Sequence, residues 1–413
     1  MRYKTILEID ASNTFSSVSY PWRLYVGVDA LRHLTDEVHR AKAERVFIVC
    51  GKSVTNKTNL LTRIKDQLGA LYAGVFDAMD KNTSWSAVRR GTDEARLARA
   101  DMLIAVGGGS VIVGARVIAI LLAENVEAGT LTGQYPNIQA GVIPSLVTTK
   151  PPIINVVTTP TSAMNRAGSE VKNDALNHRM EFYDPETRPI ALFWDAEALL
   201  TSPPELIRST GTTTFSESLR SLGVRYMNPL VEGNRIQAFR LAFRTLPRIM
   251  AEPHNVNLRI DLCAAAFLAN RSADDSIDNP NEFDPVSSNA YALATALHIR
   301  YRHIRQGEAI AAVTPVVTRL TTPRDLDRGK RIATALGVLE GGMSAATATA
   351  AAADAMESFY RSIGMPTRVQ ELGVPETDLP LLAQDALKIL STDEREQPKE
   401  HADELLRLLQ TAW

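Results

Sequence analysis

Short apolar runs alternate with amphipathic stretches of helical length between residues 23 and 195. The apolar runs are RLYVG, RVFIVC, MLIAVGGGS, IINVVTTPTS and RPIALFWD, and the first three are each followed by a helical pattern: VDALRHLTDEVHRAKA, NLLTRIKDQLGALY and VIVGARVIAILLAE. Such alternation is typical of βαβ units, which build parallel sheets covered by helices. The sequence therefore predicts an α/β domain with a parallel sheet in the N-terminal part of the chain.

The pattern changes near residue 200. The segment Ser202-Pro-Pro-Glu205 predicts a helix start, with Ser202 as N-cap, a proline in the first helical position and Glu205 completing a capping box. Beyond it we expect helices without strands, at 205–250, 257–272, 288–300, 307–320, 325–336, 344–363 and 377–390, and a polar surface loop at 274–288. Because a single core rarely grows beyond about 250 to 300 residues, we divide the chain into an α/β domain, 1–200, and an all-helical domain, 201–413.

The composition is that of a soluble globular protein, with 45% hydrophobic residues, 22% charged residues and a formal net charge of −2. This balance argues against nucleic acid and membrane surfaces as partners. The cysteines, Cys50 and Cys263, lie in apolar stretches and indicate buried thiols rather than a disulfide framework. MRYKTILEID does not resemble a signal peptide, and no apolar run is long enough to span a membrane. We expect a cytoplasmic protein.

A buried strand leads into Gly107, Gly108, Gly109 and Ser110, and an apolar helix follows. Glycines let backbone amides approach a phosphate closely, and the helix N-terminus offers unpaired N–H groups and a positive dipole. The loop matches neither the GxGxxG fingerprint nor the Walker A pattern. It predicts a pyrophosphate site in another nucleotide-binding fold, although a triple glycine after a strand also occurs as a plain tight turn.

The sequence landmarks follow one another in the order found in a known family. After the Asn82-Thr-Ser turn come the GGGS loop, Lys150-Pro-Pro before TTPTSA, Gly168-Ser-Glu-Val, and near the C-terminus Gly364-Met-Pro-Thr-Arg and Glu371-Leu-Gly-Val. In these segments, spread over almost the whole chain, the sequence resembles the iron-containing alcohol dehydrogenases. The resemblance implies an N-terminal α/β nucleotide-binding domain, an all-helical C-terminal domain and a nicotinamide cofactor.

The resemblance also implies which residues bind the dinucleotide. The GGGS loop would hold the pyrophosphate. Near the phosphates and the nicotinamide, Asn82, Thr161 and Ser162 would make further contacts. For Thr161 and Ser162 the alternative is turn chemistry around Pro160.

The choice between NAD and NADP depends on the loop after the second predicted strand, where NAD-specific relatives often carry an acidic residue. This chain has Gly51 there, followed by Lys52 and Ser53. A carboxylate would repel a 2′-phosphate, whereas glycine leaves it room and lysine and serine can bind its oxygens. We expect NAD or NADP as cofactor, with NADP(H) tolerated, unless Lys52 simply points into solvent.

The chain departs from the family at the metal site. Members usually hold a divalent metal with one aspartate and three histidines, but the matching positions here are Thr213, Glu217, Tyr291 and Gln306. Imidazole and carboxylate are the ligands that zinc and iron sites favour. A shift of the alignment toward His298 restores no more than one histidine, so we expect no catalytic metal.

Without a metal, a developing alkoxide needs hydrogen-bond donors or cations. The catalytic candidates are Arg166, Tyr291 and Gln306, with Tyr291 or His298 as proton donor. Arg166 lies in an expanded version of the family's PTTAGTGSE loop, where a guanidinium could bind a substrate carboxylate or a cofactor phosphate, or simply lie on the surface. His298 belongs to an arginine-rich run, HIRYRHIR, that also fits a solvated or interface face.

Three functions remain open at this point. The first is a metal-independent NAD(P)-dependent oxidoreductase that moves hydride between nicotinamide and an alcohol or carbonyl substrate. The second is a cyclase or lyase of the dehydroquinate synthase type, against which the lost metal ligands argue. The third is a non-catalytic homologue that binds nucleotide. We favour the first, acting on a small molecule as a homodimer.

Overall fold

The computed structural model describes residues 15–124, 146–173, 179–225, 227–275, 284–323, 325–390 and 398–413. These residues form two compact units. The α/β unit comprises Tyr20–Ile207 and Pro253–Cys263, and the helical unit comprises the described residues up to Ser19, Arg208–Glu252 and Ala264–Trp413. Two helices, α7 (Pro204–Leu222) and α9 (Val256–Asp274), contribute residues to both units.

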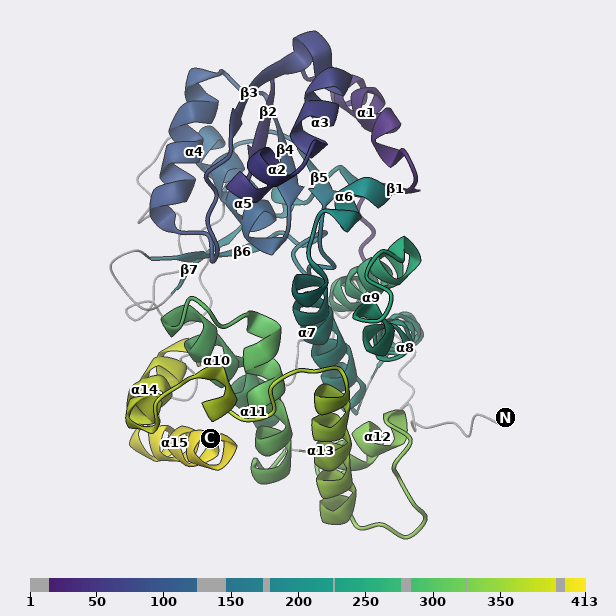
Figure 1. Ribbon diagram of the computed structural model, residues 1–413, viewed down its shortest axis with the longest axis vertical. Coiled ribbons are helices and arrows are strands. Elements are labelled where there is room, and N and C mark those ends of the chain that lie inside the picture. Colours follow the sequence, from purple (N-terminus) through teal and green to yellow (C-terminus); the bar gives the residue numbers. More distant parts are fainter. Residues whose placement is uncertain are drawn as a thin grey trace. The chain divides into compact units, whose positions relative to one another are not determined.

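A six-stranded sheet forms the centre of the α/β unit (Figure 1). In spatial order its strands are β1 (Arg23–Gly27), β8 (Ala191–Asp195), β5 (Ile153–Val157), β4 (Met102–Gly107), β2 (Val46–Cys50) and β3 (Tyr72–Phe76). All neighbouring strands are parallel. The predicted parallel sheet is therefore confirmed.

The strand β3 was not predicted from the sequence, because the helix predicted before it continued into Tyr72. The helix α3 (Leu60–Leu68) ends earlier, where Gly69 adopts a positive φ of 51°. The YAGVF segment of β3 contains alanine and glycine, which are poor strand formers, and it occupies a half-buried edge of the sheet. Its apolar residues directly continue those of the preceding helix, so no break in the pattern marks where the strand begins.

Both faces of the sheet are covered by helices. On one face, Ile48 and Ile104 pack in a cluster with residues of α1 (Leu34–Arg40) and α3. On the other face, Phe47 and Leu103 pack with α4 (Trp85–Leu97) and α5 (Gly109–Ala123). Because parallel sheets are buried on both faces, their strands are apolar throughout, and β2 and β4 are buried along their whole length.

An antiparallel hairpin, β6 (Gly168–Lys172) with β7 (Arg179–Tyr183), lies outside the main sheet and was also missed. Its strands, GSEVK and RMEFY, carry charged residues and are too short to show periodicity. The unit is completed by two short helices, α2 (Lys52–Lys57) and α6 (Ala196–Leu200).

The predicted all-helical C-terminal part is confirmed, because the described residues beyond β8 contain helices and no named strand. After α7 and α9, the helices are α8 (Pro229–Ile249), α10 (Pro285–Arg300), α11 (Gln306–Leu320), α12 (Arg328–Ala335), α13 (Ala345–Ser362), α14 (Leu379–Ile389) and α15 (Pro398–Ala412). The sequence analysis did not predict α15. Residues of α10, α11, α14 and α15 share one apolar core.

Three helix boundaries differ from the prediction. The predicted helix 205–250 is two helices, because α8 starts afresh where the Asn228 side chain accepts hydrogen bonds from the N–H groups of Leu230 and Val231. The first helix begins at Pro204, one residue after the proline expected in its first position. The predicted loop 274–288 ends early, because Asp284 caps α10.

Neither cysteine takes part in a disulfide, and both thiols are buried, as expected. A search of the described residues finds no helix that combines the length and the apolar character required to cross a membrane.

Candidate cofactor site and active-site residues

The two predicted cofactor loops lie at the same edge of the sheet. The strands β2 and β4 are neighbours, but β2 leads to β3 on one side and β4 leads to β5 on the other. Open α/β sheets bind ligands at such a switch point, in the crevice outside the carboxyl ends of the strands. The loops that leave this edge are Gly51–Ser53 after β2 and Gly107–Ser110 after β4.

The glycine loop is shaped by close packing. Gly107 ends β4 and Gly108 is the N-cap of α5. A Cβ on Gly108 would lie 2.9 Å from Oγ1 of Thr159, and one on Gly109 would lie 2.8 Å from Oγ1 of Thr161. The first N–H groups of α5 have no partner inside the helix, since no turn precedes them. The loop thus offers backbone N–H groups to a ligand, and its residues Gly108, Gly109 and Ser110 are partly exposed.

Thr159 adds a hydroxyl to this loop. Its side chain is 2% exposed, and within the described part of the chain its Oγ1 has no hydrogen-bond partner. A buried hydroxyl without a partner is costly, which suits a group that binds an acceptor from outside. The glycine loop and this hydroxyl fit the pyrophosphate of a dinucleotide.

The turn at Asn82 is joined to the glycine loop. The N–H of Asn82 donates to Oγ of Ser110 over 3.2 Å, and Oγ1 of Thr83 donates to the Ser110 carbonyl over 2.9 Å. Asn82 and Thr83 have left-handed φ values of 72° and 53°. This conformation is unusual for a β-branched residue, and such strain tends to occur at functional sites. The structure therefore brings together two predicted cofactor residues, Asn82 and Ser110.

Arg116 of α5 holds the loop that carries Thr161, Ser162 and Arg166. This side chain is fully buried, and its Nη atoms donate to the carbonyls of Ala163 and Gly168. Burial lowers the pKa of Arg116 to about 9, and the charges of Arg166 and a further arginine add to this effect.

Two more side chains fasten the same loop. Asn155 of β5 donates from Nδ2 to the Met164 carbonyl over 2.8 Å, and Arg188 donates from Nη1 to the Asn165 carbonyl over 2.9 Å. Within the loop, the Ala163 N–H donates to Oγ1 of Thr161 over 3.1 Å. This is the turn chemistry considered as the alternative role of Thr161, and it leaves the hydroxyl hydrogen available.

The loop after β2 is more open. Gly51 is the N-cap of α2, and a Cβ on it would lie 3.2 Å from the Met79 carbonyl oxygen. Lys52 and Ser53 are exposed. The side chains expected to meet a 2′-phosphate are therefore accessible to a ligand.

Comparison with known proteins agrees with this architecture. The family model of iron-containing alcohol dehydrogenases matches residues 21–196, and the model of the C-terminal domain of that family matches residues 224–413. The chain belongs to the iron-containing alcohol dehydrogenase family. The family expected from the sequence landmarks is confirmed.

Several members of the iron-containing alcohol dehydrogenase family are similar along most of their length. Lactaldehyde reductase of Escherichia coli K12 is 26% identical over 396 residues, which cover 94% of this chain and 97% of that protein. NAD-dependent methanol dehydrogenase of Bacillus methanolicus is 22% identical over 370 residues, or 89% and 92% of the two chains. The alcohol dehydrogenase from Oenococcus oeni has the same fold, with a TM-score of 0.80 at 21% identity and coverage of 97% and 100%.

Four residues are expected at the positions where iron-containing alcohol dehydrogenases usually carry metal ligands. Thr213 and Glu217 lie on α7, Tyr291 is 38% exposed on α10, and Gln306 begins α11. The Thr213 hydroxyl lies 3.4 Å from the carbonyl of Ser209, one turn earlier. Across the described ranges, no three His, Cys, Asp or Glu side chains are grouped so that they could hold a metal ion. This donor set does not fit the family's metal.

The histidines near these positions contact backbone carbonyls. His298 is 3% exposed, and its Nδ1 lies 2.8 Å from the Ala294 carbonyl of the same helix. His303 is exposed, and its Nε2 lies 2.9 Å from the Leu372 carbonyl. The buried position of His298 therefore indicates a histidine of the core rather than one that faces solvent.

Sequence reasoning missed two residues of this site, Thr159 and Arg116. A weak signal in the sequence marks each of them. Thr159 immediately precedes Pro160 in the recognised segment, and Arg116 is the single charged residue in the apolar helix GSVIVGARVIAILLA. A lone arginine in a fully apolar helix indicates a buried guanidinium with fixed hydrogen-bond partners.

Proposed function

We propose that this protein is a metal-independent NAD(P)-dependent oxidoreductase that transfers hydride between nicotinamide and an alcohol or carbonyl substrate. The observation that carries the proposal is the glycine loop at the switch point of the sheet, with the unpartnered hydroxyl of Thr159 against Gly108. The relatives, among them a lactaldehyde reductase and an NAD-dependent methanol dehydrogenase, support the same chemistry.

The α/β unit holds the cofactor in this proposal. The N–H groups of the loop Gly107–Ser110 and the hydroxyl of Thr159 bind the pyrophosphate, and Asn82 fixes the loop through Ser110. Thr161 and Ser162 orient the nicotinamide end, because Arg116 and Asn155 hold their loop in one conformation. When bound, the nicotinamide supplies the hydride acceptor or donor.

Besides hydride transfer, the reaction requires a proton donor and groups that stabilise the negative charge developing on the substrate oxygen. Tyr291 is the better proton donor of the two candidates, because it is 38% exposed while His298 is 3% exposed and bonded to its own helix. Gln306 and Arg166 supply a hydrogen-bond donor and a cation for the alkoxide, which replaces the stabilisation that a Lewis acid gives. The expected donor set supports metal independence, with a threonine, a tyrosine and a glutamine among the four positions.

Four further expectations belong to the same proposal. The folding domains are 1–200 and 201–413, the protein is cytoplasmic, it forms a homodimer, and it accepts NADP(H). Folding of the purified domains tests the first expectation, and cell fractionation tests the second. Light scattering tests the homodimer, and cofactor titration tests the acceptance of NADP(H).

The main test measures oxidation of NADH and NADPH with a panel of short aldehydes, on protein treated with a chelator. We expect turnover with at least one aldehyde and none with the Gly108→Val variant. Binding of NAD(P)H without turnover of any aldehyde or alcohol would instead favour a non-catalytic nucleotide-binding homologue, which the loss of the family's metal ligands also fits. A chain that binds neither cofactor would contradict both functions.

A further inference from the structure

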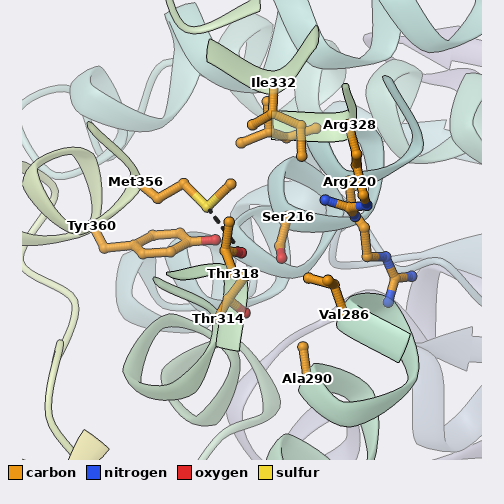
Figure 2. A pocket seen from close by; sticks show the side chains of 11 residues that line it. Ser216, Arg220, Val286, Ala290, Thr314, Thr318, Arg328, Ile332, Met356 and Tyr360 are labelled. Carbon is orange, nitrogen blue, oxygen red and sulfur yellow. Dashed lines mark hydrogen bonds between the residues drawn. The ribbon is translucent and has the colours of Figure 1, made fainter. Parts of the chain in front are cut away.

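The helical unit contains a small cavity that the proposed function does not use. It is lined by residues of α7, α10, α11, α12 and α13, among them Ser216, Arg220, Thr318, Arg328 and Tyr360 (Figure 2). The space is about that of one water molecule or a single small ion. The cavity is therefore too small for a metabolite.

Tyr360 places an unsatisfied hydroxyl in this cavity. Its side chain is fully buried, and its Oη lies beside the Ser216 hydroxyl but makes no hydrogen bond of good geometry with any described residue. Figure 2 shows the hydroxyl pointing toward Thr318 and Ser216. Within the described ranges, the Thr318 hydroxyl has a weak acceptor, Sδ of Met356 at 3.8 Å. Leaving such hydroxyls unpaired is costly, so an occupant that accepts their hydrogen bonds is favoured.

The charges around the cavity favour an anion over water. Arg328 forms an ion pair with Asp284 at 2.9 Å. The Arg220 guanidinium, by contrast, donates to the Ser287 carbonyl and pairs with no carboxylate of the described chain. One positive charge therefore remains uncompensated at the cavity wall. A buried or half-buried charge is most stable when it is paired.

We propose that this cavity binds a halide-sized monovalent anion, held by Arg220 and by the hydroxyls of Tyr360, Ser216 and Thr318. Hydroxyl and guanidinium groups are donors, so all of them can point at one anion. Because the lining residues come from five helices, the anion stabilises their packing. The site lies inside the helical unit, and its existence does not depend on the proposed oxidoreductase activity.

Chloride dependence of thermal unfolding tests the site. At constant ionic strength, replacing gluconate with chloride should raise the unfolding temperature by a few degrees, about 3 °C. The rise should be absent in Arg220→Gln and retained in Arg240→Gln, a matched change at an exposed arginine outside the cavity. Tyr360→Phe keeps the shape of the core and should reduce the rise. An equal rise in wild type and Arg220→Gln would contradict the proposal.

Diffraction from crystals grown in bromide gives a second test of the same full-length protein. We expect an anomalous peak between Tyr360 and Arg220. An ordered water molecule at that position in bromide, with no anomalous signal, would replace the anion with a structural water and overturn the assignment.

Discussion

The hydroxyl of Thr159 lies against Gly108, so that a Cβ on this glycine would come within 2.9 Å of Oγ1. The two residues belong to different strand ends, β4 and β5, that meet at one edge of the sheet. Their contact explains why a glycine occupies the N-cap of α5, a position where serine, threonine and aspartate are favoured. It also provides the sharpest test of the cofactor site.

Gly108→Val should abolish dinucleotide binding without unfolding the protein. The valine side chain would displace Thr159 and cover the backbone N–H groups that face the pyrophosphate. Calorimetric titration with NADH and NADPH measures the affinity, and circular dichroism checks the fold. Gly233→Val, at an exposed helical position with open space around it, is the control and should bind normally. Unchanged affinity in a folded Gly108→Val would remove the glycine loop from the site.

Arg116→Met should loosen the loop that carries Thr161 and Ser162. It leaves the carbonyls of Ala163 and Gly168 without their donor, so we expect weaker dinucleotide binding and a loss of roughly 2 to 4 kcal/mol in the free energy of unfolding. Arg116→Lys keeps the positive charge but lacks the forked guanidinium that reaches two carbonyls. It should therefore recover only part of the lost affinity and of the lost stability.

The control for this prediction is Arg89→Met, which changes an exposed arginine of α4. Urea unfolding and calorimetry should show wild-type values for it. If Arg116→Met lowers stability but binds NADH and NADPH as tightly as wild type does, the loop needs no anchoring for cofactor binding.

Gly51→Asp should lower the affinity for NADPH and leave NADH bound or improved. A carboxylate after β2 accepts hydrogen bonds from the ribose of NAD and repels a 2′-phosphate. The Cβ would meet the Met79 carbonyl oxygen at 3.2 Å, which requires a shift of a few tenths of an ångström. Titration of wild type and Gly51→Asp with NADH and NADPH gives the ratio of the two affinities for each protein. Wild type that already strongly prefers NADH, with no change in the variant, would show that this loop does not select the cofactor.

Chelation should leave any oxidoreductase activity intact. The expectation rests on Thr213, Tyr291 and Gln306, which stand where the family usually supplies metal ligands. Elemental analysis of the purified protein is the direct measurement. One tightly held iron or zinc per chain, whose removal stops turnover, would establish a metal site that these positions do not suggest.

Lys150→Met should destabilise the α/β unit by about 3 to 5 kcal/mol, because it leaves two carboxylates without their cation. The ammonium group is buried, 2.7 Å from Oε1 of Glu124 and 2.9 Å from Oδ2 of Asp184. Lys57→Met, at an exposed position of α2, should cost little. Urea unfolding at neutral pH compares the two variants, and equal stability would show that the buried cation contributes nothing.

The ion pair between Lys150 and Glu124 also predicts that the stability of the protein depends on pH. The hydrogen bond from Lys150 lowers the pKa of the Glu124 carboxyl from its ordinary value of 4.5. A lowered folded-state pKa stabilises the protein above the unfolded value, and this stabilisation is lost as the pH falls through the folded pKa. The stability difference between wild type and Glu124→Gln should therefore be full near neutral pH and shrink below about pH 4.5. A difference that is constant with pH would exclude this origin.

The sequence by itself determined the features that depend on neighbouring residues. Alternating strand and helix patterns specified the parallel sheet, and the glycines between a buried strand and an apolar helix marked Gly107–Ser110 as a candidate phosphate loop, because both signals are contained in short segments. The order of the landmarks gave the family, and Thr213, Tyr291 and Gln306 could be read as departures from it without a structure.

Tertiary structure decided the features that depend on residues far apart in the chain. Arg116 meets the carbonyls of Ala163 and Gly168 across 47 and 52 positions, and no local pattern specifies such partners. The two candidate proton donors differ in exposure, with Tyr291 38% exposed and His298 3% exposed, and this difference depends on how α10 packs. The cavity at Tyr360 exists only where five helices meet, because its hydroxyls and its arginine come from helices that lie up to 144 residues apart in the sequence, from Ser216 to Tyr360.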